Sequence, residues 1–364
     1  MMSRLRMAVI GVGHLGKEHA RILAGLPGVE LVGVVDINAD QAQAVARRCG
    51  TRAYADYWPL LNLVDAAVVV VPTTHHHAIA SEFLGRGIPV LVEKPLAINV
   101  QQAEALAGLA RRHNVPLQVG HIERFNPAFE ELGHYPLQAK FVECERCGPF
   151  TGRSTDIGAV LDLMIHDLDL LLALVRSPVC SVEALGVSVF GKHEDVANAR
   201  LVFANGCVAN VTASRVSATP ARRMRVWAAE GYASLDFAQR CLTLVQPSED
   251  VRRHGLDCRQ LDAANLAMLR HELFGRHLQV RKLDCNRGDQ LTRELEHFVD
   301  CVRTGSCPRA SGEDGCRAMA LATRVLETIH AHRWDGSAGG PTGPLQPPIP
   351  VGRLFNAAEG EAAA

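Results

Sequence analysis

The stretch from Arg6 to Gly16, RMAVIGVGHLG, constrains the fold of this chain more than any other. Met7 to Ile10 is a continuous apolar run, which is typical of a parallel strand buried on both faces. The run leads directly into a glycine-rich segment of the form G-x-G-x-x-G, and a helix-like stretch, Leu15–Leu26, follows. A strand before these glycines and a helix after them predict a dinucleotide-binding unit.

Each glycine of this segment has a separate physical role. Gly11 permits the tight turn, Gly13 lets the backbone approach a pyrophosphate, and Gly16 allows helix and strand to pack closely. His14 and Leu15 lie where the helix N-terminus offers N–H groups and the positive end of its dipole. We therefore expect all five residues to contact the cofactor.

Asp36 indicates which cofactor binds. A second apolar run, Leu31 to Val35, ends in this acid, twenty positions after Gly16. An acid at that distance accepts hydrogen bonds from the adenosine ribose hydroxyls. The alternative is a turn residue before Asn38 and Asp40. A 2′-phosphate would face Asp36 unfavourably and no arginine follows directly, so we expect NAD in preference to NADP.

Composition excludes several classes of partner. The 364 residues suffice for about two domains, each with its own core. A net charge of −1, with acids and bases interspersed, predicts no nucleic-acid or membrane-surface partner. No apolar run approaches the roughly 20 residues of a membrane span, and no signal peptide is recognisable. The 11 scattered cysteines favour reduced thiols in a cytoplasm.

The first third of the chain alternates strand-like and helix-like segments, which predicts an α/β fold with a doubly wound parallel sheet. Strands are expected at Leu5–Ile10, Val29–Val35, Ala66–Val71, Pro89–Val92 and Pro116–Val119. Helices are expected at Leu15–Leu26, Asp40–Cys49, His75–Arg86 and Asn99–His113, with Asn99 as N-cap. Because ligands of such sheets bind beyond the carboxyl ends of the strands, residues directly after each strand are candidate site residues.

The remainder has an α+β pattern with an open, mostly antiparallel sheet. After a buried helix at Thr155–Val175, strands are expected at Ser181–Phe190, Val196–Phe203, Cys207–Arg215, Met224–Ala229, Ala233–Phe237 and Leu242–Val245, and helices at Leu291–Arg303 and Gly312–His330. We divide the chain into an NAD-binding Rossmann domain, 1–122, a substrate and oligomerisation domain, 123–335, and a tail, 336–364. Glycine, proline and alanine predict a disordered tail with a short docking segment at Val351–Phe355.

Two segments after predicted strands carry reactive side chains. Pro72 and Thr73 precede three histidines, residues 75–77, which cannot all face one metal ion from a helix start. We expect a helix that opens beside the cofactor, with one histidine near it. Further on, Lys94 stands between Glu93 and Pro95, at the end of a strand facing the nicotinamide. The alternative, a solvated surface lysine, is less favoured there than a catalytic one.

The helix at Thr155–Val175 is apolar nearly all round, which indicates burial. Asp162, His166 and Asp169 stand at i, i+4 and i+7, within about 60° of one another on a regular helix. The stripe is either a satisfied polar network of the core or a catalytic set in which Asp162 orients the imidazole of His166. We favour catalysis.

Two further groups carry weaker signals. Cys144 and Cys147 form a C-x-x-C in a strand-like segment with no second pair for zinc, and we interpret them as ordinary thiols. Arg215, Arg222 and Arg223 flank a turn between strands, where they either meet phosphates or remain solvated.

From about Arg6 to His330 the chain resembles the glucose–fructose oxidoreductase, inositol dehydrogenase and rhizopine catabolism family. The matching motifs are GVGHLG at 11–16, PTTHHHAIA at 72–80, EKP at 93–95 and DLMIHDLD at 162–169. The resemblance implies a catalytic set of Lys94, Asp162 and His166. It also places Pro72, Thr73, His76, Glu93 and Lys94 with Asp36 and the glycine loop in the cofactor site. No metal is implied.

Within the family, GHIERFNPAF at 120–129 and LMIHDLDLL at 163–171 are most similar to the UDP-N-acetylglucosamine 3-dehydrogenases, which prepare a 3-amino sugar for lipid A. This implies NAD-dependent oxidation at C3, with Lys94, Asp162, His166, Asp169, Arg124 and Asn126 contacting substrate. Asn126 replaces an aspartate that many members carry. The alternatives are a dehydrogenase of a free sugar or inositol, and a non-catalytic sensor of NAD and sugar. The resemblance also implies a homodimer or homotetramer through the open sheet, and a downstream aminotransferase as a possible partner.

Overall fold

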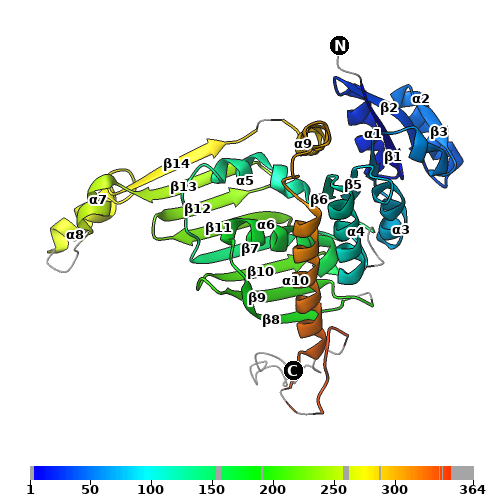
Figure 1. Ribbon diagram of the computed structural model, residues 1–364. Helices are drawn as coiled ribbons and strands as arrows, with labels where there is room; N and C mark the ends of the chain where they lie inside the picture. The colour runs from blue at the N-terminus through cyan, green and yellow to red at the C-terminus, as the bar shows by residue number, and fades with distance from the viewer. Residues whose placement is uncertain are drawn as a thin grey trace, which may run out of the picture.

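The computed structural model describes residues 4–152, 157–189, 192–256, 262–286, 288–335, 337 and 339–345. These residues form a six-stranded and an eight-stranded sheet, which lie in separate parts of the molecule (Figure 1). The predicted α/β class, with a parallel sheet followed by a mostly antiparallel one, is confirmed.

The first sheet is parallel throughout, in the order β3-β2-β1-β4-β5-β6. Its strands are β1 (Leu5–Ile10), β2 (Val29–Val35), β3 (Arg52–Tyr54), β4 (Ala66–Val69), β5 (Val90–Glu93) and β6 (Leu117–Gly120). The helices between them are α1 (Gly16–Gly25), α2 (Ala39–Cys49), α3 (Thr73–Leu84) and α4 (Val100–His113), with a 3₁₀ turn η1 (Trp58–Asn62). Because helices cover both faces, the central strands are buried throughout and read as continuous apolar runs.

Local signals set the helix ends in this half. The Asn38 side chain accepts a hydrogen bond from the backbone N–H of Gln41 and caps α2, and Asn99 caps α4 in the same way, as predicted. Gly50 ends α2 in the left-handed region. The strand predicted to reach Val71 ends at Val69, and β3 is too short to show in the sequence pattern.

The second sheet has the order β14-β13-β12-β11-β7-β10-β9-β8, and only β7 and β10 run parallel among its described pairs. Its strands are β7 (Phe141–Cys147), β8 (Val179–Val187), β9 (Val196–Phe203), β10 (Val208–Ser214), β11 (Ala221–Ala228), β12 (Gly231–Asp236), β13 (Cys241–Pro247) and β14 (Leu278–Asp284). The other elements are η2 (Ile122–Phe125), α5 (Pro127–Leu132), a π-helical turn η3 (Val160–Met164), α6 (Ile165–Val175), α7 (Glu249–His254), α8 (Ala263–Glu272), α9 (Gln290–Thr304) and α10 (Gly312–Ala331).

One face of this sheet packs on a core that α6 and α10 complete, and the other face is polar. The alternation of buried and exposed residues along β9 reflects this arrangement. On the polar face Arg225 and Glu143 form an ion pair. The last residue of the strand predicted at Ser181–Phe190, and the first two of the helix predicted at Thr155–Val175, lie outside the described residues.

The two C-terminal helices return to the first sheet. Leu295 and Phe298 of α9 belong to the apolar cluster beneath α1 and β2, and Ala318 and Met319 of α10 join the one beneath α4. Both helices lie in the segment predicted to form the domain 123–335; α9 packs on the first sheet and α10 packs on the cores of both sheets. Sequence reasoning missed this because an amphipathic helix does not specify which sheet it covers.

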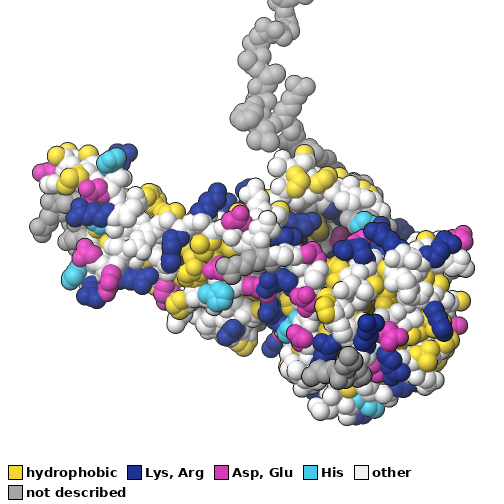
Figure 2. All heavy atoms as spheres, turned by 90° about the horizontal axis from the view of Figure 1, so that it is seen from above, with side chains coloured by type: hydrophobic (Ala, Val, Ile, Leu, Met, Phe, Trp, Pro, Cys, Tyr) yellow, Lys and Arg dark blue, Asp and Glu magenta, His cyan; other side chains and the backbone are white. Residues whose placement is uncertain are grey.

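Residues from β13 to β14 form an arm that projects from the body (Figures 1 and 2). Its two helices, α7 and α8, bury no residue, and their weak apolar periodicity gave no sequence signal. On the face shown in Figure 2, acidic and basic side chains are interspersed without a large area of one sign.

Part of the predicted disordered tail makes defined contacts. The indole Nε1 of Trp334 donates to the carbonyl of Gly343 at 2.9 Å. The backbone N–H of Ser188 donates to the carbonyl of Pro344 at 2.9 Å. The tail thus returns to the edge strand β8 at 339–345, and the predicted docking segment Val351–Phe355 lies outside the described residues. No helix of the described chain is long and apolar enough to cross a membrane.

Candidate active site

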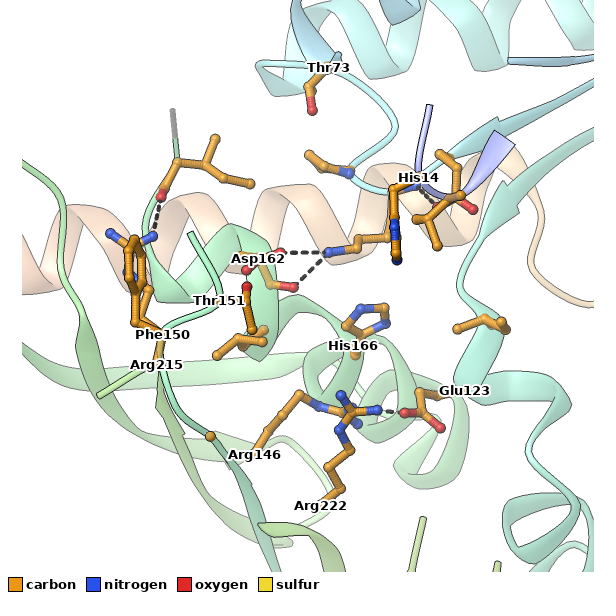
Figure 3. Close-up of a pocket in the computed structure, with 18 of the residues that line it drawn as sticks. His14, Thr73, Glu123, Arg146, Phe150, Thr151, Asp162, His166, Arg215 and Arg222 are labelled. Atoms are coloured by element: carbon orange, nitrogen blue, oxygen red, sulfur yellow. Dashed lines mark hydrogen bonds and ion pairs between the residues drawn. The ribbon is translucent and has the colours of Figure 1, made fainter. Parts of the chain in front are cut away.

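A cavity of about 780 Å³ opens where the carboxyl ends of β1, β4 and β5 face β7, β10 and the turn η3. This volume is typical of small-molecule sites, which range over roughly 300–1,000 Å³. Figure 3 shows side chains from both parts of the molecule pointing into it, among them His14 of the glycine loop, Asp162 of η3, His166 of α6 and Arg222 of β11.

The glycine loop forms the wall of the cavity on the side of the first sheet. Gly11 has a φ of +88°, and a Cβ there would lie 2.5 Å from the carbonyl oxygen of Val70. A Cβ at Gly16 would lie 1.9 Å from the carbonyl oxygen of Gly11, whereas one at Gly13 would meet nothing within 4 Å. Gly11 and Gly16 therefore serve packing, while Gly13 leaves open space where a pyrophosphate can approach the backbone.

Asp36 lies at the end of β2 and holds this loop. Its carboxylate accepts hydrogen bonds from the backbone N–H groups of Val12 and Asn38, both at 2.9 Å. His14 lines the cavity, and Leu15 is 46% exposed at the start of α1. A loop with an open second glycine, a helix N-terminus and an acid at the next strand end fits an NAD molecule.

The residues after β4 divide between the cavity and the interior. Pro72 and Thr73 line the cavity at the start of α3. His76 is buried, with Nδ1 at 2.9 Å from the carbonyl oxygen of Pro95 and Nε2 at 2.8 Å from that of Val71. Burial lowers the pKa of His76. The predicted cofactor histidine thus joins two loops of the site from beneath and does not line the cavity.

Glu93 pairs with a histidine that sequence reasoning missed. His19 of α1 is fully buried, and its Nε2 lies 3.0 Å from Glu93 Oε1. Burial favours a higher pKa for Glu93, but the hydrogen bond and charge of His19, together with the charge of Lys94, outweigh it and lower the pKa. The other oxygen of Glu93 accepts the backbone N–H of Lys94 at 3.1 Å. Glu93 therefore fixes the strand end from which Lys94 projects.

Lys94 and Asp162 meet across the cavity. The Nζ of Lys94 donates to the carbonyl oxygen of Asp162 at 2.7 Å and to its Oδ1 at 3.0 Å (Figure 3). Both side chains are mostly buried, with 16% and 22% of their surface exposed. Asp162 lies in the π-helical turn η3, a feature often found at functional sites. The structure thus brings these two predicted residues together.

His166 lies beside this pair, one turn along α6. Its Nδ1 is buried and has no hydrogen-bond partner among the described residues. Burial and the charges of Lys94, Arg146 and other cations lower its pKa well below the ordinary value, so the imidazole is neutral at pH 7. No hydrogen bond joins it to Asp162 in the described structure. Asp162 was expected to orient His166, but the wider π turn directs the carboxylate to Lys94 instead.

Three residues predicted to contact substrate lie away from the cavity. Asp169 is 1% exposed and accepts two hydrogen bonds from Arg124, at 2.7 and 2.6 Å. Asn126 is fully buried, where its side chain caps α5 and donates to Glu123 and to the carbonyl of Phe237. All three have protein hydrogen-bond partners, and none lines this cavity.

A buried ion-pair cluster supports the cavity floor and was also missed. The guanidinium of Arg146 donates to Glu123 at 2.8 Å and to both oxygens of Asp167 at 2.9 Å. Burial opposes its charge, but these two acids outweigh it and raise the pKa of Arg146. The sequence of β7 contains a pattern that could have indicated this cluster. Alternate residues of a strand share a face, so Arg146 lies on the buried face with Cys144, where a charged side chain needs acidic partners.

The cysteine motif has no metal-binding geometry. Cys144 points into the core and Cys147 borders the cavity, because residues three apart on a strand face opposite sides. Both are free thiols. Across the described ranges, no group of three or more His, Cys, Asp or Glu residues is arranged to hold a metal ion.

Comparison with family models gives two matches. Residues 5–121 match the model described as an oxidoreductase family with an NAD-binding Rossmann fold. Residues 138–234 match the model of the GFO/IDH/MocA C-terminal domain.

Individual relatives include a UDP-N-acetylglucosamine 3-dehydrogenase of Acidithiobacillus ferrooxidans, 35% identical over 331 residues, which cover 91% of this chain and 99% of that protein. A solved structure of the Acidithiobacillus enzyme superposes with a TM-score of 0.79, covering 90% of this chain and 98% of the other. A scyllo-inositol 2-dehydrogenase (NAD⁺) of Bacillus subtilis is 29% identical over 237 residues, 60% of this chain and 69% of that protein. A levoglucosan dehydrogenase solved with NADH has a TM-score of 0.74 at 18% identity and shares the fold.

Proposed function

Because this chain belongs to the GFO/IDH/MocA oxidoreductase family, with an NAD-binding Rossmann domain, we propose that it oxidises C3 of UDP-N-acetylglucosamine to the 3-keto sugar nucleotide. The observation that carries the proposal is the Lys94–Asp162 pair, placed with neutral His166 in a cavity that the glycine loop borders. The glycine loop and Asp36 would hold NAD⁺, which would supply the hydride acceptor.

Each of the three side chains has a separate role at the substrate hydroxyl. Once its ammonium group has released a proton, Lys94 accepts the hydroxyl proton as hydride leaves the same carbon, and the carboxylate of Asp162 stabilises the ammonium ion that forms again. His166 is neutral, and its ring hydrogen-bonds the reacting oxygen, which orients the hydroxyl group toward Lys94. Proton and hydride leave from one carbinol group, so the product is a ketone.

The sugar nucleotide is preferred over a cyclitol for two reasons. The UDP-N-acetylglucosamine 3-dehydrogenase is 35% identical to this chain over 331 residues, whereas an inositol 2-dehydrogenase of Rhizobium meliloti, which matches over 352 residues, is 23% identical. The cavity also carries the guanidinium of Arg222, which the oxidation of a neutral cyclitol does not use. A sensor without turnover would need no complete set of Lys94, Asp162 and His166.

The setting of the protein follows from the same proposal. A 3-keto sugar nucleotide is a substrate for an aminotransferase, which we propose as the downstream partner in a cytoplasm, where the free thiols remain reduced. We also propose a homodimer or homotetramer through the polar outer face of the second sheet, which carries self-complementary charges such as Arg225 and Glu143.

The proposal is tested by NADH absorbance after purified protein is mixed with NAD⁺ and UDP-N-acetylglucosamine, with an aminotransferase and glutamate present to remove the ketone. Lys94→Ala is expected to lower kcat/KM by about 10²- to 10⁴-fold, the range typical of a lost general base. Its affinity for NAD⁺, measured by calorimetry, stays within about 3-fold of wild type, because the glycine loop is unchanged.

Lys282→Ala is the matched control, since Lys282 is exposed on β14 in the arm. It retains wild-type kcat/KM. NADH formation by Lys94→Ala at the wild-type rate contradicts the assignment of the base. Silence with UDP-N-acetylglucosamine but turnover of an inositol or a free sugar selects the alternative dehydrogenase, and silence over a broad panel of both classes selects the sensor.

A further inference from the structure

Arg222 lines the cavity but has no part in the proton and hydride transfer proposed above. It lies on β11, where its neighbour Arg223 faces the opposite, polar side of the sheet. Figure 3 shows the Arg222 side chain next to Arg146, and His166 lies between this pair and His14 of the glycine loop. Arg222 is therefore at the end of the cavity away from the cofactor loop.

The other lysine and arginine side chains of the cavity are neutralised. The pairs are Lys94 with Asp162, Arg146 with Glu123 and Asp167, and Arg215 with Asp195. In contrast, no hydrogen bond or ion pair holds the guanidinium of Arg222 within the described ranges of the chain. Arg222 thus presents five N–H donors to the cavity with no protein acceptor.

The charge of Arg222 affects the ionisation of His166 at the reacting centre. It contributes, after burial and the nearer cations, to the lowering of the pKa of His166. The guanidinium of Arg222 lies beside that of the buried Arg146, and the two positive charges repel each other. A ligand anion bound next to Arg222 would reduce this repulsion. Phosphate oxygens match the planar fork of arginine and accept two parallel hydrogen bonds from it.

We propose that Arg222 binds the diphosphate of the sugar nucleotide and thereby selects this substrate class over free sugars and cyclitols. The proposal rests on the function proposed above. C1, which bears the diphosphate, is separated from C3 by a single ring atom, so a sugar with C3 at Lys94 and His166 has its diphosphate within one long side chain of that centre. Cyclitols and free sugars have no group for Arg222 to bind.

A purely structural role for Arg222 makes a different prediction. Arg146 faces two acids, Glu123 and Asp167, and a second guanidinium close by also balances their charge. In that case removal of Arg222 destabilises the fold and weakens uridine and UDP alike. Diphosphate binding affects UDP alone, so the two roles are separable.

The experiment measures the affinities of UDP and uridine for the full-length protein loaded with NAD⁺, by calorimetry, and KM and kcat for UDP-N-acetylglucosamine. Arg222→Ala is expected to weaken UDP binding and raise KM by about 10- to 100-fold, the usual value of a charge-assisted hydrogen bond, with uridine affinity unchanged. Arg222→Lys restores part of this loss because it keeps the charge without the fork. Arg223→Ala, the matched control on the opposite face, binds UDP as wild type does.

The outcomes are distinguishable. Equal loss of UDP and uridine affinity in Arg222→Ala, with a lowered melting temperature, overturns the proposal in favour of charge balance. Wild-type UDP binding by a folded Arg222→Ala also overturns it, while the proposed dehydrogenase function stands as long as the wild-type protein oxidises UDP-N-acetylglucosamine. Failure of the wild-type protein to bind UDP and to oxidise this sugar nucleotide overturns both.

Discussion

Asp162 and Asp169 lie seven residues apart on one helical segment, in contrasting surroundings. Asp162 borders the cavity, where its partner is the flexible ammonium of Lys94. Asp169 is buried against the planar guanidinium of Arg124, which also donates to the carbonyl of Arg309. The first arrangement leaves a group able to exchange protons with a ligand, and the second fixes two segments of the chain together.

Asp162 and Asp169 are the same residue type on the same helical segment, so the acid itself does not decide its role. The difference lies in the cationic partner, which is a lysine at the reacting end of the segment and an arginine at its structural end. Arginine remains charged in all conditions, so its pairs hold structure, whereas lysine accepts and releases protons. Asp167, which pairs with Arg146, falls on the structural side. The predictions below test this difference, first at the two aspartates and then at buried residues near them.

The largest effect is expected for Asp169→Ala. Removal of one partner of a buried ion pair usually costs about 3–5 kcal/mol of unfolding free energy, because the other charge is left buried. We expect a value near the lower end of about 3–5 kcal/mol, because Asp314 also lies 3.4 Å from Arg124. Urea unfolding measures the loss. A stable Asp169→Ala protein with a raised KM would contradict the structural role and restore the predicted contact with substrate.

Asp162→Asn is the counterpart on the cavity side. Asparagine keeps the shape and the backbone carbonyl but removes the charge that stabilises the ammonium ion of Lys94. We expect kcat to fall about 10- to 100-fold, which corresponds to about 1.4–2.7 kcal/mol of activation free energy. The unfolding free energy falls by less than in Asp169→Ala, because the Asp162 side chain is 22% exposed whereas that of Asp169 is 1% exposed. A stability loss as large as that of Asp169→Ala would remove the distinction.

The outcome of the sequence predictions follows the same division. The glycine loop, Asp36 and the strand end at Lys94 were predictable because each depends on a few neighbouring residues and a known strand–turn–helix geometry. Asp162 and His166 were found from their spacing, but the π turn between them changes the direction of the carboxylate. A helical wheel assumes a fixed angle per residue, so it cannot predict this change of direction.

The partners could not be predicted because they are distant in sequence. Arg124 reaches Asp169 across 45 positions, and His19 reaches Glu93 across 74. A buried polar residue shows its partner only when the topology is known. The same reason explains the packing of α9 and α10 on the first sheet, where helical periodicity identified the helices but not their destination.

Asn126→Ala tests a smaller effect on the structural side. Its amide donates to Glu123 and to the carbonyl of Phe237, and its oxygen caps α5, so the alanine variant leaves buried partners without hydrogen bonds. We expect a loss of about 1–2 kcal/mol in unfolding free energy, with KM unchanged. Thermal unfolding and steady-state kinetics measure the two quantities. A selective rise in KM would instead favour the predicted contact with substrate.

The smallest effect concerns two buried histidines, of which His166 lines the cavity and His121 does not. The rings of His166 and His121 lie 6.5 Å apart, and burial lowers the pKa of each below 6.5. Below pH 6.5 the unfolded chain binds protons at these positions that the folded chain does not. Stability is therefore lost as the pH falls through 6.5 and is unaffected above it, by at most about 1.4 kcal/mol per pH unit for each histidine.

His166→Gln and His121→Gln are each expected to flatten the decline in unfolding free energy between pH 7.5 and about 5.5, since glutamine binds no proton. Of the two variants, only His166→Gln lowers kcat as well, because the ring of His166 lines the cavity and that of His121 does not. His193→Gln, at an exposed position, leaves the slope unchanged. Equal losses of kcat in both buried variants would show that His121 also acts in the reaction. The reacting residues would then include the segment after β6 as well as η3 and α6.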